Sequence, residues 1–304
     1  MKKTIIAIII ILVLGITTYS LLKDTGGRVA TKDDIVGDQT QTDTGATSTD
    51  QTMEKEWSRQ SVIGQSEDGK NIVAYQFGTG DKELLFVGGI HGGYSANTSV
   101  VAFDLIDHIN DNNDFVPEGM QVTVVPVLNP DGLSSVVNFE NGFKSSDVTA
   151  SESEKIAARF NANDVDLNRN FDCEWQANAK WQSKNVSGGS SAFSESESQA
   201  MRDYVNSNNP TAVVVWYSAG GGVYASSCRD GVLPETIDIT DVYAKASGYK
   251  AYESYDFYAT TGDMVNWLAK QKIPAISVLL TTHTSSETSK NIDGVEALVK
   301  YYSN

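Results

Sequence analysis

The sequence has few of the residues that bind metals. Its 304 residues include two cysteines and three histidines, which are His91, His108 and His283. A catalytic zinc needs three protein ligands and an open position for water, so this small supply restricts how such a site could be built. His108 falls among aspartates within an expected helix, a pattern typical of a solvated helix face rather than of a metal ligand.

Positive charge is also scarce. The chain has 23 lysine and arginine residues against 39 aspartate and glutamate residues, and its formal net charge is −16. An acidic surface repels phosphate, which excludes nucleic acid as a partner and argues against anionic lipid. The composition, 40% hydrophobic and 20% charged, is ordinary for a soluble core, and the length suits one large α/β domain with an appendage.

The N-terminal segment is apolar and uncharged. Residues 4–22 carry no charged side chain and would form a helix about 28 Å long, enough to cross a bilayer. Lys2 and Lys3 precede it and indicate a cytoplasmic N-terminus. We predict an uncleaved membrane anchor over residues 1–23, which makes the chain a single-pass protein of the cell membrane with an extracytoplasmic C-terminal domain. A cleaved signal peptide, and thus a secreted protein, is the alternative.

Residues 24–56 contain no aromatic side chain and are rich in threonine, aspartate, glutamine and glycine. Such a segment cannot bury enough apolar surface to offset the entropy that folding costs, so we predict a disordered linker. The predicted domain, residues 57–304, contains Cys173 and Cys228. Because an exported domain meets an oxidising environment, we predict a disulfide between them, worth about 4 kcal/mol. Two free buried thiols would be expected in a reducing compartment.

Apolar strands alternate with helices along the predicted domain. Strands are expected at residues 71–77, 83–88, 122–127, 213–216 and 275–280, and helices at residues 96–109, 194–206, 261–270 and 290–301. This alternation predicts an α/β fold with a mixed, mainly parallel sheet and helices on both faces. Sites in such sheets form at the carboxyl ends of the strands, where His91, Tyr217 and Leu279 fall.

Two arginines stand out in the middle of the chain. Arg169 follows Asn168, and Arg159 lies ten residues earlier. A guanidinium offers a planar fork of donors that matches the two oxygens of a carboxylate, and the asparagine adds a further donor beside it. This pattern predicts a carboxylate pocket. The alternative is that both arginines pair with Asp166 or Asp172 inside a folded loop.

These motifs, in this order over roughly residues 57–304, resemble those of the zinc carboxypeptidases (M14, carboxypeptidase A-like). The resemblance implies a carboxypeptidase-like fold. It also implies that Asn168 and Arg169 hold the terminal carboxylate of a peptide and that Arg159 polarises the scissile carbonyl. Tyr258 matches the family tyrosine that closes over bound peptide.

Most of the groups that the family uses for catalysis are replaced. His91 matches the first zinc ligand, but the glutamate that should follow it is Tyr94, or Ser95 if the turn carries one extra residue. Tyr217 stands at the second histidine ligand, and Leu279 stands at the glutamate that acts as base. The resemblance therefore implies a degenerate member with no intact catalytic set and no zinc cofactor.

The leading hypothesis is a membrane-tethered, catalytically inactive relative that binds the C-termini of peptides or cell-wall peptides. A second hypothesis is an active zinc carboxypeptidase with a rearranged metal site, built from His91, His283 and a carboxylate such as Asp172. A third is a scaffold whose outer surface binds a protein partner and whose cleft is vestigial. The sequence leaves the choice of peptide open.

Overall fold

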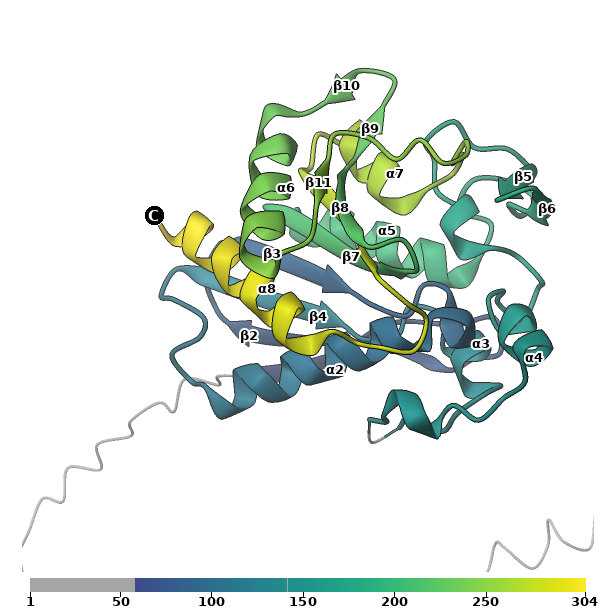
Figure 1. The fold of residues 1–304 in the computed structure, drawn as a ribbon, viewed down its shortest axis with the longest axis horizontal. Coiled ribbons are helices and arrows are strands. Elements are labelled where there is room, and N and C mark those ends of the chain that lie inside the picture. The colour runs from purple at the N-terminus through teal and green to yellow at the C-terminus, as the bar shows by residue number, and fades with distance from the viewer. Residues whose placement is uncertain (1–57, 141) are drawn as a thin grey trace, which may run out of the picture. The chain divides into compact units, whose positions relative to one another are not determined.

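A computed structural model describes residues 58–140 and 142–304 of the chain (Figure 1). The strands are β1 (Ser58–Gln65), β2 (Asn71–Gly78), β3 (Lys82–Val87), β4 (Met120–Val125), β5 (Asn178–Trp181), β6 (Lys184–Ser187), β7 (Ala212–Ser218), β8 (Gly222–Ala225), β9 (Ser227–Cys228), β10 (Gly231–Val232), β11 (Ala251–Tyr252) and β12 (Ala275–Leu280). The α-helices are α2 (Ala96–Asp111), α3 (Pro130–Ser134), α4 (Glu152–Ala157), α5 (Ser196–Asn208), α6 (Pro234–Ser247), α7 (Met264–Lys270) and α8 (Thr288–Ser303). Three 3-10 turns are η1 (Gly92–Ser95), η2 (Ser145–Asp147) and η3 (Leu167–Arg169).

One large sheet organises the domain. Its eight strands have the order β1-β2-β4-β3-β7-β12-β8-β11. The central strands β4, β3, β7 and β12 are mutually parallel, and the pairs β1–β2, β2–β4 and β8–β12 are antiparallel. The predicted mixed, mainly parallel sheet is therefore confirmed.

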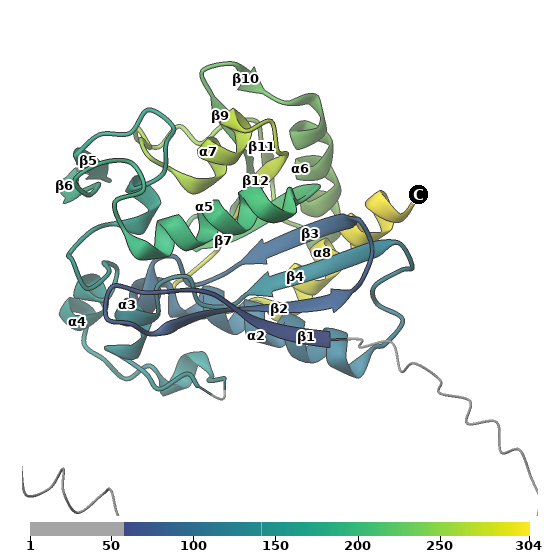
Figure 2. The same cartoon turned by 180° about the vertical axis from the view of Figure 1, so that it is seen from behind.

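Helices cover both faces of this sheet. Helices α2, α6 and α8 lie on one face, and α5 and α7 lie on the other (Figures 1 and 2). Strand β7 shows why its sequence is continuously apolar. Val214 and Trp216 pack toward α2, α6 and α8, whereas Val213, Val215 and Tyr217 pack toward α5 and α7. Successive side chains point to opposite faces, so a strand covered on both faces needs apolar residues at every position.

Two helices add to or differ from the predicted local elements. The segment Asn129–Gly132 leads into the short helix α3, which was not predicted, and the Asn129 side chain caps it by accepting a hydrogen bond from the Gly132 N–H at 2.8 Å. Helix α7 begins at Met264 rather than at residue 261. Its cap is the Asp263 side chain, which accepts from the Asn266 N–H at 3.1 Å.

The predicted localisation in a membrane is corrected. Within residues 58–140 and 142–304, no helix has both the length and the apolar character needed to cross a bilayer. The predicted anchor, residues 1–23, and the predicted linker, residues 24–56, lie outside the described residues.

The predicted disulfide is confirmed. Cys173 and Cys228 are bonded across a sequence separation of 55 residues, with their Cα atoms 6.1 Å apart. The bond joins the segment that follows Arg169 to the strand β9. It therefore ties the loop that carries the Asn-Arg pair to the two-stranded sheet of β9 and β10.

Candidate functional site

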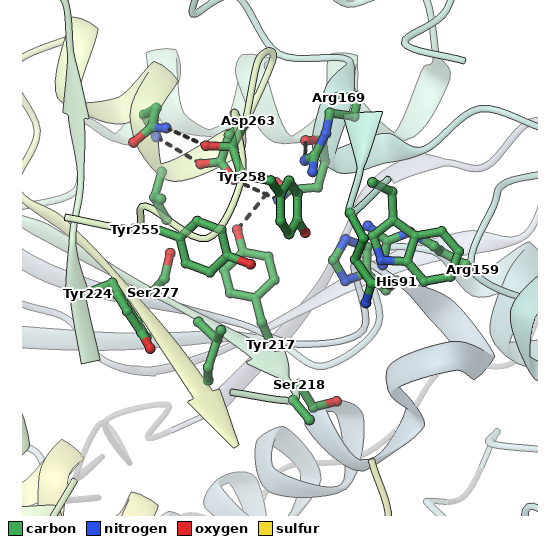
Figure 3. A pocket seen from close by; sticks show the side chains of 18 of the residues that line it. His91, Arg159, Arg169, Tyr217, Ser218, Tyr224, Tyr255, Tyr258, Asp263 and Ser277 are labelled. Atoms are coloured by element: carbon green, nitrogen blue, oxygen red, sulfur yellow. Dashed lines mark hydrogen bonds between the residues drawn. The ribbon is translucent and has the colours of Figure 1, made fainter. Parts of the chain in front are cut away.

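A cleft opens at the carboxyl ends of strands β3, β7 and β12. His91 follows β3, Tyr217 lies near the end of β7, and Leu279 is paired with Tyr217 across the parallel strands β7 and β12. The cleft encloses about 150 Å³, which is the size of a cavity that holds a benzene-sized molecule. Figure 3 shows His91, Arg159, Arg169, Tyr217 and Tyr258 around it.

The cleft gathers nearly all of the residues singled out in the sequence. These residues are His91, Tyr94, Arg159, Asn168, Arg169, Tyr217, Tyr258, Leu279 and His283. Ser95 is buried in the turn η1 and does not line the cleft, whereas Tyr94 does. Asp172 lies outside the cleft and pairs with Lys270 at 2.8 Å. The metal site that would combine Asp172 with His91 and His283 is therefore not formed.

His91 is buried and its ring has no hydrogen-bond partner among the described residues. Oδ1 of Asp166 lies 3.7 Å from Nε2, beyond hydrogen-bond distance. Burial, together with the positive charge of Arg159, holds the pKa of His91 well below its ordinary value. The ring is therefore neutral and keeps one N–H donor and one acceptor for a bound molecule.

Arg159 is held by a buried ion pair. Its Nε and Nη2 both donate to Oδ2 of Asp166, at 2.9 and 2.8 Å, and its guanidinium lies 4.4 Å from the centre of the Trp181 ring. Burial alone would raise the pKa of Asp166, but the charges of Arg159 and Arg169 hold it below its ordinary value. Arg159 therefore forms the ion pair with Asp166 that was the alternative to an open carboxylate pocket.

Arg169 is bound differently. Its Nε donates to the carbonyl oxygen of Lys180 at 2.8 Å, and its Nη1 donates to the carbonyl oxygen of Asn168. It is 1% exposed, yet it pairs with neither Asp166 nor Asp172, because these carboxylates bind Arg159 and Lys270. Neutral carbonyl groups fix its orientation without neutralising its charge. Its remaining donors can therefore bind an anion in the cleft.

Asn168 is oriented by a network that the sequence did not reveal. Its Nδ2 donates to Oδ2 of Asp263 at 2.7 Å, and its Oδ1 accepts from the Met264 N–H at 3.0 Å and from the Tyr217 hydroxyl at 3.3 Å. Burial raises the pKa of Asp263, and the charge of Arg169 opposes this effect. An aspartate just before a helix is a capping signal, but nothing in its spacing links Asp263 to Asn168.

Gly262 brings these two segments together. Its backbone has a φ of +68°, and a Cβ atom at this position would collide with the carbonyl oxygen of Arg169. The Gly262 N–H donates to the carbonyl oxygen of Cys173 at 2.8 Å, and the Phe171 N–H donates back to Gly262 at 3.0 Å. Only glycine combines this backbone conformation with so close an approach.

Aromatic side chains form the other wall of the cleft. Tyr258 is half-buried, with its ring centre 5.9 Å from the Arg169 guanidinium and 5.4 Å from that of Tyr255. Tyr255 also packs against Tyr224, whose buried hydroxyl has no hydrogen-bond partner among the described residues. The sequence predicted Tyr258 from its motif. The other two rings and Trp181 come from short strands and loops without a recognisable pattern.

The residues present do not fit a catalytic zinc. Of the positions that the resemblance to the family assigns to zinc ligands, only His91 carries a metal-binding side chain, and Tyr94 and Tyr217 stand at the other two. Within the described ranges no group of three histidine, cysteine, aspartate or glutamate residues is placed to hold a metal ion. Tyr217 uses its hydroxyl to position Asn168. Burial raises the pKa of this hydroxyl well above its ordinary value, so it is not available as a phenolate ligand.

Comparisons with known proteins place these features in a family. Residues 48–293 match the zinc carboxypeptidase family, peptidase M14. Gamma-D-glutamyl-L-diamino acid endopeptidase 1 of Lysinibacillus sphaericus is 23% identical over 216 residues, which cover 65% of this chain and 54% of that protein. The chain thus spans about half the length of this curated relative.

Solved structures share the fold. Bovine thrombin-activatable fibrinolysis inhibitor, in complex with tick carboxypeptidase inhibitor, superimposes with a TM-score of 0.64 at 14% identity, covering 81% of this chain and 90% of that one. Carboxypeptidase A from Helicoverpa armigera gives 0.63 at 19% identity, with 81% and 68% covered. Murein-tripeptide amidase MpaA from Escherichia coli O157 gives 0.55 at 20% identity, with 79% and 91% covered. At these identities the likeness shows the carboxypeptidase-like fold alone.

Proposed function

The chain belongs to the zinc carboxypeptidase family, and on this basis we propose that its cleft binds the C-terminal carboxylates of peptides, cell-wall peptides included, without hydrolysing them through zinc. Arg169 and Asn168 hold the carboxylate, Tyr258 covers the bound residue, and Arg159 with His91 faces the preceding carbonyl group. The roles of these side chains are part of the proposal.

The observation that carries the proposal is the state of Arg169. It is buried in the wall of the cleft, held by two backbone carbonyl groups, and paired with no carboxylate among the described residues. Burial opposes its charge, but Asp166, Tyr258 and Asp263 outweigh this effect without forming an ion pair with it and hold its pKa above the ordinary value, so the guanidinium stays charged. A carboxylate that binds here replaces lost hydration with a charge-assisted contact of about 1.5–3 kcal/mol. This contact alone supports dissociation constants near the millimolar to high-micromolar range.

The relatives support peptides as the class of ligand. One is named as a gamma-D-glutamyl-L-diamino acid endopeptidase, and one structural neighbour is a murein-tripeptide amidase. Both names describe enzymes that act on peptides, and the second concerns peptides of murein. A small cleft of about 150 Å³ suits one terminal residue rather than a long segment.

The other side of the cleft supports the proposal that zinc chemistry is lost. A metal-activated water needs its ligands and a nearby base. Leu279 cannot accept a proton, and Tyr94 packs edge to face against Trp181 at 4.9 Å. A rearranged zinc enzyme, the competing hypothesis, would need ligands from outside the described residues to complete a site around His91.

The test is a calorimetric titration with a short peptide that has a free C-terminus. Arg169→Ala should weaken binding at least about tenfold, because the lost contact is worth 1.5–3 kcal/mol. Arg229→Ala is the matched control, since Arg229 is an exposed arginine that faces Glu174 away from the cleft. Equal affinity of the wild-type protein and Arg169→Ala would disprove the proposed carboxylate pocket.

A further inference from the structure

A serine and a histidine meet in the wall of the cleft. Ser218 is the last residue of β7, directly after Tyr217 (Figure 3), and His283 lies in the loop between β12 and α8. The Oγ of Ser218 lies 3.0 Å from Nδ1 of His283, and both side chains line the cavity. An imidazole nitrogen at this distance from a hydroxyl is the arrangement that activates serine as a nucleophile.

Asn97 fixes the position of this pair. Its Nδ2 donates to the carbonyl oxygens of Thr282 and Ser285, at 2.7 and 2.9 Å, which anchors the loop that carries His283. Because both amide hydrogens are used, Oδ1 of Asn97 must face Ser218, whose Oγ lies 3.0 Å away. Asn97 is 1% exposed, so this orientation is set by the core rather than by solvent.

The imidazole is placed to accept a proton. Its ring centre lies 4.5 Å from that of Tyr94, which supports one side of the ring. Although the side chain of His283 is exposed, desolvation by the wall of the cleft lowers its pKa below the ordinary value, so the ring is neutral near pH 7. In the structure the single hydrogen of the Ser218 hydroxyl is donated to Oδ1 of Asn97. Rotation about the Cβ–Oγ bond turns this hydrogen to Nδ1 of His283, 3.0 Å away, and leaves the lone pairs of Oγ free to attack a molecule in the cleft.

We propose that Ser218 and His283 form a nucleophile–base pair that accepts the acyl group of an ester bound in the cleft. Oγ of Ser218 attacks the carbonyl carbon while its proton passes to Nδ1 of His283. The ester C–O bond then breaks, and the leaving oxygen takes that proton. Water attacks the acyl-serine with His283 again as base, which releases the acid and restores Ser218.

The same cavity offers donors for the oxyanion that forms during attack. The ring of His91 has no hydrogen-bond partner among the described residues, and the Arg159 guanidinium also lines the cavity. Fixed hydrogen-bond donors of this kind supply the larger part of transition-state stabilisation in acyl transfer. Esters are the substrate class because an alkoxide leaves with less proton transfer than the amine of a peptide bond.

The test is covalent labelling with a fluorophosphonate, followed by the rate of 4-nitrophenyl acetate hydrolysis. Wild-type protein should gain one label per chain, on Ser218. Ser218→Ala should lose the label, and His283→Ala should react at least about 100-fold more slowly, the usual share of a general base. The matched controls are Ser183→Ala, an exposed serine outside the cavity, and His108→Ala, whose ring faces Glu296.

Three results would overturn the proposal. They are a wild-type protein that takes no label, a label on a residue other than Ser218, and equal hydrolysis rates for His283→Ala and the wild type. An unchanged thermal midpoint of Ser218→Ala shows that its fold is intact. Ser218 does not contact Arg169, so the carboxylate titration succeeds or fails independently of the labelling.

Discussion

The two sides of the cleft differ in polarity. On the carboxylate side, Arg169, Asn168 and Asp263 form a connected polar network in which backbone groups of neighbouring segments take part. On the side where the family binds zinc, Tyr217 and Leu279 fill the space with apolar surface, and the ring nitrogens of His91 have no partner among the described residues.

This difference separates polar groups that the fold needs from those that a ligand needs. Asp166 neutralises Arg159 in a buried pair and belongs to the fold whether or not a metal binds. Arg169 makes no ion pair among the described residues, and the ligand that we propose would be its first direct anionic partner. Metal ligands, in contrast, can be replaced by packed aromatic and aliphatic side chains at little cost to stability.

The largest effect should come from breaking the buried pair. Asp166→Ala leaves Arg159 buried without a counter-ion, and we expect a loss of about 3–5 kcal/mol in the free energy of unfolding. Asp172→Ala removes the exposed pair with Lys270 and should cost less than about 1 kcal/mol. Urea unfolding of both variants measures the contrast. Similar losses for the two would show that the buried pair is not structural.

The disulfide should matter nearly as much. Replacing Cys173 and Cys228 by serine opens a loop of 55 residues and should lower the free energy of unfolding by about 4 kcal/mol. Reduction of the wild-type protein should give a similar loss. A variant as stable as the wild type would mean that the loop around Arg169 is held by packing alone.

A buried carboxyl outside the cleft sharpens the contrast with Asp166. Glu197 accepts hydrogen bonds from Asn161 and the Glu67 N–H, and burial raises its pKa from 4.5 to about 7. Since the folded state holds this proton more tightly than the unfolded state, its contribution to stability is complete below pH 4.5 and is lost as the pH rises through 7.

The expected result is a fall of a few kcal/mol in the free energy of unfolding between pH 5 and 8, on the order given by this pKa difference. Glu197→Gln should remove most of that slope. Chemical unfolding at several pH values measures it. An equal slope in both proteins would place the titrating group elsewhere.

A smaller effect should distinguish the fork of an arginine from a point charge. Arg169→Lys keeps the charge but cannot donate two parallel hydrogen bonds, so binding of a free-acid peptide should weaken about tenfold, or about 1.4 kcal/mol. The C-terminal amide of the same peptide should bind equally weakly to both proteins. If lysine binds the free acid as well as arginine does, charge alone explains the site.

No gain of activity should come from restoring one catalytic group. Leu279→Glu supplies a base but no metal-bound water on which it could act. Activity should require the three substitutions Tyr94→Glu, Tyr217→His and Leu279→Glu together. Peptide hydrolysis assayed with added zinc checks this. Turnover by Leu279→Glu alone would show that a metal site already exists.

The sequence predicted those parts of the fold in which apolar residues form a continuous run. Strand β12, expected at residues 275–280, has those bounds in the structure, because a strand covered on both faces leaves a strong pattern. Short strands near the end of the sheet, such as β8 and β11, leave little pattern, and helix α6 was not predicted. The membrane localisation was wrong for the part of the chain that the structure describes.

The site could be predicted only where a residue stands in a motif. Arg159, Arg169 and Tyr258 line one cavity as expected. The choice of Asp166 rather than Asp172 as the partner of Arg159 depends on how the loop folds, and both lie close in sequence. A role for Asp263 was not predicted, because its hydrogen bond to Asn168 joins residues 95 positions apart in the sequence and no local pattern indicates it.

The most direct test of the account is a calorimetric titration of the wild-type protein with a free-acid peptide, repeated with zinc and with a chelator. The account predicts the same weak affinity in both conditions, with an intact peptide recovered at the end and much weaker binding of the C-terminal amide. Binding or cleavage that requires zinc and is lost in His91→Ala would contradict it.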